Sequence, residues 1–177
     1  MPREIVHRGR KISVALDTTI LPDGSTLRRD MIFHPGAVVI LPMVSPTSVC
    51  LLRNHRFVID TTLWEVPAGT LEPGEAIEPA ARRELAEETG YAAARWTYLG
   101  FFYASPGVLD EKLHLFVAED LTPGPMDLEP GETIDPQIVE WDEAMRMCLA
   151  GEILDAKTVT AILLWDRKRT RSAGDRV

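Results

Sequence analysis

The sequence predicts one mixed α+β domain, and three observations support this prediction. Short apolar and β-branched segments alternate with turn signals in the first third of the chain, a pattern that is typical of strands. Residues 78–89 have the composition and the end residues of a helix. The 177 residues fit one ordinary domain, and no repeat, low-complexity tract or linker divides them.

The first elements expected along the chain are strands. The strand-like segments of the N-terminal part are residues 12–16, 31–33, 37–41, 49–52 and 64–66. The segment 37–41 is apolar throughout and partly β-branched, which is typical of a strand buried on both faces. The turn residues Pro22, Asp23 and Gly24 predict a hairpin between the first two segments.

The clearest helix is expected at Glu78–Thr89. Most of its residues are Ala, Arg, Glu and Leu, which are good helix formers. Pro79 suits the first helical position, where a missing N–H loses no hydrogen bond. Gly90 suits the left-handed residue that ends many helices.

The rest of the chain is expected to continue with strands and to end with two helices. The later strands are predicted at residues 96–103, 112–118 and 138–141. Residues 122–136 contain four prolines and two glycines, so a loop is expected there. Asp142 is expected to cap a helix that stops near Gly151, and Asp155 a terminal helix through about Arg167. The apolar face predicted for that terminal helix consists of Val159, Ile162 and Leu163.

The composition disfavours nucleic acid and membranes as partners. The net charge is 19 − 27 = −8, so bulk attraction to polyanions is not expected. The longest apolar run, 37–44, is too short to span a bilayer, and the charged N-terminus lacks the apolar core of a signal peptide. Cys50 and Cys148 lie in no CxxC pair, so free thiols and a cytoplasmic location are expected.

Three glutamates crowd the C-terminal half of the predicted helix. At about 100° per residue, Glu84, Glu87 and Glu88 share an arc of roughly 100°. They lie near the negative end of the helix dipole, and two carboxylates about 5 Å apart at an effective dielectric near 20 repel by about 3 kcal/mol. A solvated acidic face is one interpretation. A site for a hard divalent cation is the other, since Mg²⁺ prefers oxygen ligands.

The residues around these glutamates follow a fixed spacing. The specified positions are Gly69, Glu75, Arg83, Glu84, Leu85, Glu87, Glu88, Gly90 and Tyr91. This pattern resembles the Nudix box at every fixed position, and the element order around it fits that superfamily over nearly the whole chain. The resemblance implies the Nudix fold: a mixed β-sheet sandwiched between helices, with N-terminal antiparallel strands.

The resemblance also implies a metal site. Its expected cofactor is Mg²⁺, with Mn²⁺ as the alternative. Glu84 and Glu88 are the expected main ligands, the Ala68 carbonyl completes the site, and Glu87 assists or holds water. Arg83 and Glu75 are expected to brace the loop against the helix, and Ala81 and Leu85 to pack in the core.

Features outside the box narrow the activity. Pro106 lies sixteen residues after Gly90. The strand segment 51–56 and the segment 64–69, which leads into the box, are two further features. Together they resemble the ADP-ribose pyrophosphatase / nucleoside diphosphate sugar hydrolase branch. That branch implies hydrolysis of a small-molecule nucleoside diphosphate sugar, with ADP-ribose giving AMP and ribose 5-phosphate. The alternatives are GDP-mannose or another nucleotide sugar, a nucleoside triphosphate, and a non-catalytic nucleotide-binding module.

The branch implies a catalytic carboxylate in the loop after Pro106 and Gly107, which are themselves expected to contact substrate. Glu111 occupies the place of the residue that acts as base or orients the water, and Asp110 is the alternative. Glu87 is a second catalytic candidate. A solvated loop acid is the competing interpretation of Glu111.

Three strand residues are expected near the substrate. Arg56 should contact phosphate, because its planar cation suits phosphate oxygens. Arg53 is either a second phosphate contact or a structural arginine at a strand end. Glu65 either binds a polar edge of the base or ribose or is a surface strand residue.

The branch further implies a homodimer. Residues 1–36 are expected to form a strand extension that serves dimerisation, residues 37–170 the hydrolase domain, and residues 171–177 a frayed tail. Arg28 and Asp30 are expected either to touch the nucleoside bound by the other subunit or to be charges on an edge strand that resists aggregation.

Overall fold

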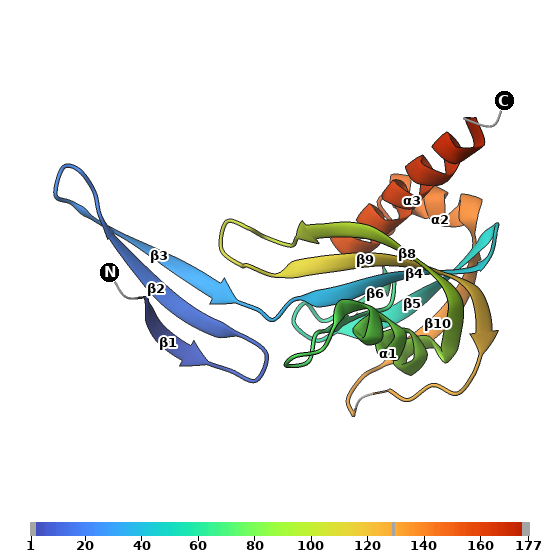
Figure 1. Cartoon of the computed structure of the whole chain (residues 1–177), viewed down its shortest axis with the longest axis horizontal. Helices are drawn as coiled ribbons and strands as arrows, with labels where there is room; N and C mark the ends of the chain where they lie inside the picture. Colours follow the sequence, from blue (N-terminus) through green and yellow to red (C-terminus); the bar gives the residue numbers. More distant parts are fainter. Residues whose placement is uncertain (1–2, 129, 175–177) are drawn as a thin grey trace.

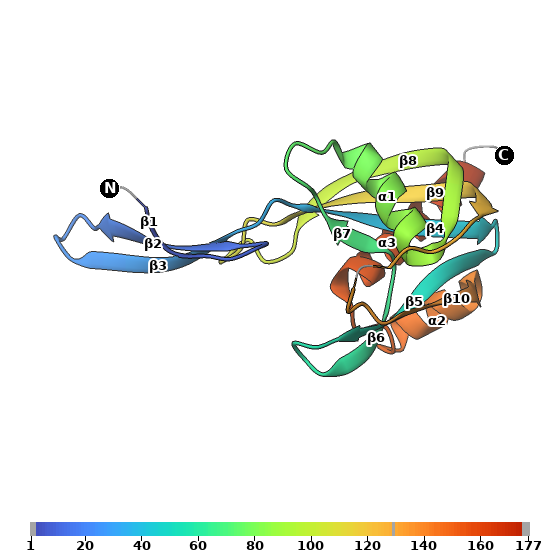
Figure 2. The same cartoon turned by 90° about the horizontal axis from the view of Figure 1, so that it is seen from below.

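The computed structural model describes residues 3–128 and 130–174, and its N-terminal strands form a small separate sheet. The strands of this sheet, which is antiparallel in the order β1-β2-β3, are β1 (Glu4–Arg8), β2 (Ser13–Ile20) and β3 (Thr26–Phe33). The turn between β2 and β3 contains Gly24, whose φ of 81° lies in the left-handed region. The predicted hairpin is therefore confirmed. Figures 1 and 2 show this sheet projecting away from the remaining elements.

The second sheet is mixed and forms the centre of the molecule. Its strands are β4 (Ala37–Ser45), β5 (Ser48–Arg56), β6 (Thr61–Glu65), β7 (Ala68–Thr70), β8 (Tyr91–Tyr103), β9 (Lys112–Pro123) and β10 (Ile134–Glu140). The order is β10-β5-β4-β9-β8, with β6 paired to β5 and β7 to β4. Strands β4 and β9 are parallel, and the other pairs are antiparallel.

Helices cover both faces of this central sheet. They are α1 (Ile77–Thr89), α2 (Trp141–Leu149) and α3 (Ala156–Gly174). In β4, Val38 and Ile40 pack with Leu85 of α1, whereas Val39 and Leu41 pack with residues of α2 and α3. This alternation follows from the two-residue period of a strand. The predicted α+β class, with a mixed sheet between helices and antiparallel strands before it, is confirmed.

The ends of α1 explain how its charged residues are placed. Gly90 has φ 71° and ends the helix by donating its N–H to the Ala86 carbonyl, as expected. The helix begins at Ile77, so the prediction that Pro79 is the first helical residue is wrong. Pro79 is the third, which is tolerated because the first four N–H groups have no partner inside a helix.

The predicted N-cap is wrong for α2 and confirmed for α3. The N-cap of α2 is Glu140, and Asp142 lies inside the first turn, where its charge still suits the helix dipole. Asp155 does cap α3, since its Oδ2 accepts the Thr158 N–H at 3.0 Å. In α3, Leu163 is 40% exposed, so its predicted place on the apolar face is wrong. Ile162 is buried, as predicted, and Ala161 is buried beside it.

The predicted loop and tail are both shorter than expected. Strand β9 extends to Pro123 and β10 begins at Ile134, so only the residues between them lie outside strands. Strand β10 accommodates Pro136 because it is an edge strand, and a proline there loses no ladder hydrogen bond that the sheet needs. Helix α3 extends to Gly174, which shortens the predicted tail, and residues 175–177 lie outside the described part. None of the described helices is both long and apolar enough to cross a membrane.

Candidate active site

A cavity of about 350 Å³ brings together charged side chains from many elements. Its acidic residues are Glu72, Glu84, Glu87, Glu88, Glu111 and Glu132, and its basic residues are Arg10, Lys11, Arg56, Arg83 and Lys157. Residues 68–71 and the side chain of Leu113 form other parts of its wall. Both basic residues and a group of carboxylates line this cavity, so it suits a ligand that is anionic and binds with a cation.

Two of the glutamates of α1 lie on its buried face. Glu84 is 8% exposed and Glu88 is 4% exposed. The Ala68 N–H donates to Glu88 Oε2 at 2.9 Å, which fixes one carboxylate against β7. A Cβ at Gly69 would overlap the carboxyl group of Glu84. The position therefore needs glycine so that strand β7 and Glu84 can approach each other.

Burial raises the pKa of both carboxyl groups above the ordinary value. The pKa of Glu88 rises to about 8, mainly because burial penalises its charged form and further because of the charges of Glu84 and Glu132. Burial also raises the pKa of Glu84, although its hydrogen bond with Arg83 acts in the opposite direction. Two buried carboxylates without a compensating cation are thus unfavourable at neutral pH.

Arg83 organises the rest of the cluster. Its Nε and Nη2 donate to the two oxygens of Glu75, each at 3.0 Å, so the expected pair is present. Its Nη1 donates to Glu84 Oε1 at 2.7 Å and to Glu87 Oε2 at 2.9 Å. The hydrogen bond to Glu75 is the main reason that the pKa of Arg83 is raised. Glu75 and Arg83 therefore hold the loop before α1 to the helix.

The donor set fits a hard divalent cation in kind. Carboxylate and carbonyl oxygens are the ligands that Mg²⁺ and Mn²⁺ prefer. A cation bound here would offset the energetic cost of burying the charges of Glu84 and Glu88. Within residues 3–128 and 130–174, no three His, Cys, Asp or Glu side chains are already gathered as a metal-binding set. Arg83 donates to one oxygen each of Glu84 and Glu87, and the Ala68 N–H donates to one oxygen of Glu88, so a cation would compete with these donors for the carboxylates.

Glu65 lies behind the wall of the cavity. It is 1% exposed, so the interpretation as a surface strand residue is wrong. Arg56 donates to its Oε1 from Nε at 2.7 Å and to its Oε2 from Nη2, and Lys157 Nζ donates to Oε2 at 2.7 Å. Burial alone would raise the pKa of Glu65, but these two cations hold it below its ordinary value. Arg56 lines the cavity, and its predicted contact with phosphate remains a prediction.

Glu111 reaches the cavity from the start of β9. Its loop is attached to the end of β3, because Ile32 N–H donates to the Val108 carbonyl at 2.8 Å and Asp110 N–H donates to the Ile32 carbonyl at 3.1 Å. His34 Nδ1 lies 3.4 Å from Glu111 Oε1 but accepts the Gly36 N–H at 3.1 Å. The carboxylate of Asp110 accepts the His34 N–H at 2.8 Å, which gives Asp110 a structural role.

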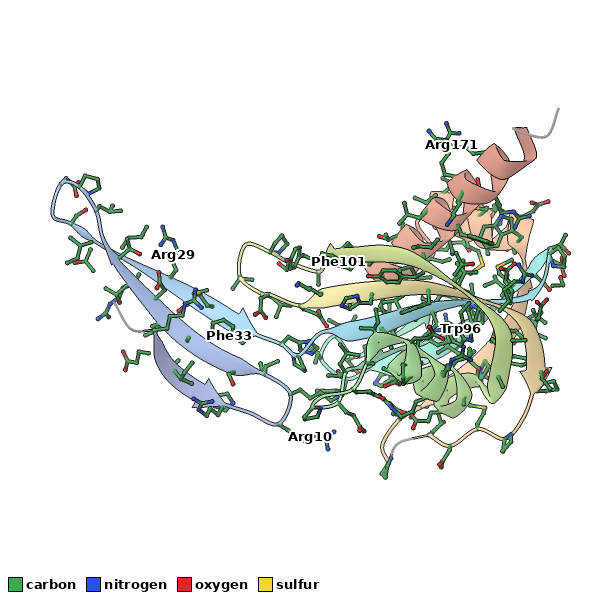
Figure 3. All side chains as sticks on the ribbon, viewed as in Figure 1. Arg10, Arg29, Phe33, Trp96, Phe101 and Arg171 are labelled. Carbon is green, nitrogen blue, oxygen red and sulfur yellow. The ribbon has the colours of Figure 1, made fainter. Side chains whose placement is uncertain are left out.

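Several residues predicted to bind substrate lie elsewhere. Arg53 stacks on the Trp64 ring, 4.8 Å from its centroid, and is absent from the cavity wall, which favours the structural interpretation. Arg28 is exposed on β3. Asp30, Pro106 and Gly107 line a second cavity of about 430 Å³ between β3 and the loop before β9. Arg29 and Phe33 of β3, which are labelled in Figure 3, line it as well.

Besides Glu72, which lies inside the box, four charged residues of the first cavity were not predicted from the sequence. Lys157 lies in the first turn of α3, Glu132 precedes β10, and Arg10 and Lys11 lie in the turn between β1 and β2. Arg10 lies at the end of the N-terminal sheet that faces the rest of the molecule (Figure 3). No local pattern marks these residues, since tertiary contacts alone bring them to the box. This chain thus adds cations from its own N-terminal sheet to its own cavity.

Comparisons with known proteins agree with this geometry. The family model described as the NUDIX domain matches residues 33–161. An ADP-ribose pyrophosphatase of Bacillus subtilis (strain 168) is 36% identical over 162 residues, which cover 90% of this chain and 88% of that protein. A methanol dehydrogenase activator of Bacillus methanolicus is 35% identical over 161 residues, with 90% and 87% coverage.

A solved structure matches over nearly the whole length. The structure is titled as the crystal structure of ADP compounds hydrolase, and its TM-score is 0.84. The match covers 98% of this chain and 94% of that chain. The sequence identity is 24%, so this likeness bears on the fold. It includes the N-terminal sheet as well as the central domain.

Proposed function

The chain belongs to the NUDIX domain family, and we propose that it is a Mg²⁺-dependent hydrolase of nucleoside diphosphate sugars. The preferred substrate in this proposal is ADP-ribose, and the products are AMP and ribose 5-phosphate. The relative that is 36% identical is named an ADP-ribose pyrophosphatase, which supports this choice among nucleotide sugars.

One observation carries the proposal. Buried carboxylates of Glu84 and Glu88 and the cations Arg56 and Lys157 line one cavity. A carboxylate cluster alone would bind a cation, and cations alone would bind an anion. Their combination suits a diphosphate that binds together with a metal ion. The metal ion would lie against the carboxylates, and the phosphate oxygens would lie against the cations.

The residues of this chain have distinct roles in the proposed reaction. Glu84, Glu88 and the Ala68 carbonyl would hold Mg²⁺ or Mn²⁺, with Glu87 assisting. When bound, the metal supplies a positive charge that neutralises the diphosphate oxygens and acidifies water. Arg56 holds a phosphate oxygen with the N–H groups that Glu65 leaves unused.

The chemical step needs one water and one base. The Glu111 carboxylate takes a proton from the water as its oxygen attacks phosphorus, and the bond from that phosphorus to the bridging oxygen breaks. The bridging oxygen leaves with the other phosphoryl group, so two phosphate monoesters form from one diphosphate and one water. The place of Glu111 in the wall of the cavity that also holds Glu84 and Glu88 supports this role, because a water held in that cavity is within its reach.

A substrate panel tests the proposal. We expect purified protein with Mg²⁺ to hydrolyse ADP-ribose faster than GDP-mannose, ADP-glucose, UDP-glucose or NADH, with activity lost in EDTA and restored by Mg²⁺ or Mn²⁺. Released phosphate monoesters are measured by a coupled phosphatase assay. Preference for GDP-mannose would change the substrate within the class, and preference for dGTP would overturn the branch assignment. Turnover of none of them would favour the non-catalytic nucleotide-binding module.

The proposal includes a homodimer in which Arg28 and Asp30 approach the nucleoside bound by the other subunit. Its support is exposed apolar surface: Phe57 is 85% exposed and Val58 80% exposed at the turn after β5, and Val6 is 50% exposed in β1. We expect light scattering after size exclusion to give a mass of about 39 kDa, twice the 19.7 kDa of one chain. A mass near 20 kDa at micromolar concentration would contradict this expectation.

A further inference from the structure

Two cations from distant parts of the chain meet at one buried carboxylate. Arg56 ends β5, Glu65 ends β6, and Lys157 lies in the first turn of α3. Both oxygens of Glu65 accept hydrogen bonds from Arg56, and Oε2 also accepts one from Lys157. Glu65 itself is buried, whereas both cations line the cavity. The carboxylate thus fixes two positive groups in the cavity wall.

The start of α3 is locked in place by further contacts. Asp155 accepts a hydrogen bond from Lys157 Nζ at 2.9 Å with Oδ1, and it caps the helix with Oδ2. Thr158 Oγ1 accepts the N–H of Val66, the residue after Glu65, at 2.8 Å. Lys157 is therefore held from both sides, and its flexible side chain is ordered before any ligand binds.

The hydrogen bonds of the two cations leave donors for a ligand. An ammonium group has three N–H donors, and Glu65 and Asp155 take two of those of Lys157. A guanidinium group has five, and Glu65 takes one from Nε and one from Nη2 of Arg56. The Lys157 side chain is 13% exposed and that of Arg56 is 43% exposed. The spare donors therefore belong to groups that a ligand in the cavity can reach.

We propose that Lys157 contacts a phosphate oxygen of the substrate and that Glu65 is the positioning residue that pairs Lys157 with Arg56. This inference rests on the proposed function and extends it, because it assigns a residue of α3 to the diphosphate. A purely structural role is a poor explanation for the arrangement. Burying an ion pair offers little net stability compared with apolar packing, whereas two fixed cations at the cavity wall match the two phosphoryl groups of a diphosphate.

Replacing Lys157 tests the phosphate contact. We expect Lys157→Met to raise KM for ADP-ribose by about tenfold or more, with kcat changed by less than about threefold, because binding shared by ground state and transition state is lost. Lys157→Arg, which keeps the charge and the donors, should recover most of the affinity. Lys168→Met, on the exposed side of the same helix, is the matched control and should leave KM unchanged.

Direct binding separates this role from folding. Calorimetry with an ADP-ribose analogue whose bridging oxygen is a methylene group should show the same weakening for Lys157→Met, while its melting temperature stays within a few degrees of wild type. Glu65→Gln should also weaken binding of the analogue, because Arg56 and Lys157 then lose the charge that holds them together. Wild-type affinity in Lys157→Met would overturn the inference. If wild-type protein neither binds nor cleaves any nucleotide sugar, the proposed function fails instead.

Discussion

Glu88→Gln is expected to lower kcat about a thousandfold, equivalent to about 4 kcal/mol of transition-state stabilisation. Glu88 is a proposed metal ligand on the buried face of α1. Glutamine keeps the size of the side chain and an oxygen that can still accept the Ala68 N–H. The substitution therefore removes the charge and little else. Steady-state rates on ADP-ribose at saturating Mg²⁺ measure the loss.

The same substitution should stabilise the protein when no metal is present. The folded pKa of Glu88, about 8, lies above its ordinary value of 4.5. Between these values the folded state binds a proton that the unfolded state does not, so stability falls as pH rises from about 4.5 to about 8. We expect metal-free Glu88→Gln to melt about 4–8 °C above wild type at pH 8, for a gain of about 2 kcal/mol. The difference should vanish near pH 4.5.

The matched control for this experiment is Glu78→Gln. Glu78 lies in the first turn of α1 and forms an exposed ion pair with Arg82 at 2.7 Å, which contributes little to stability. Its turnover and melting temperature should stay close to those of wild type. A Glu88→Gln protein that melts below wild type in EDTA would show that Glu88 is needed for folding rather than for a cation.

The parts of the site that the sequence predicted are those built from neighbouring residues. Glu84 and Glu88 share one helix face because of helix geometry, and Gly90 ends that helix by its left-handed φ. Gly69 lies fifteen residues before Glu84, yet only the structure shows that a side chain there would overlap the carboxyl group. Spacing thus predicted which carboxylates share a helix face, and packing explains why position 69 is a glycine.

The residues that the sequence could not predict depend on long-range contacts. Lys157 is 92 residues from Glu65, with which it pairs, and no periodicity links the two. Strand β10 is stabilised by pairing with β5, which is also far away in the sequence. The local composition around its start is rich in proline, and this composition alone predicted a loop. Leu163 was assigned to the buried face of α3 from spacing alone, but the sheet contacts a neighbouring strip of that helix.

Glu111→Gln is expected to lower kcat by about a hundredfold or more with little change in KM, which is the usual contribution of a general base. The side chain is 20% exposed and lines the cavity that holds the carboxylates of α1. Because its loop is joined to β3 by backbone hydrogen bonds, the amide should occupy the place of the carboxylate. Rapid-quench measurement of a single turnover isolates the chemical step from product release.

Glu132→Gln is the comparison that makes this test decisive. Glu132 lines the same cavity from the loop before β10, and its charge helps to raise the pKa of Glu84 and Glu88. If Glu111 is the base, Glu132→Gln should lower kcat by less than about tenfold. Glu132 then affects the reaction only through the electrostatic effect of its charge on Glu84 and Glu88. A larger loss for Glu132→Gln than for Glu111→Gln would assign proton removal to the loop before β10. In that case the attachment of Glu111 to β3 would serve to shape the cavity rather than to place a base.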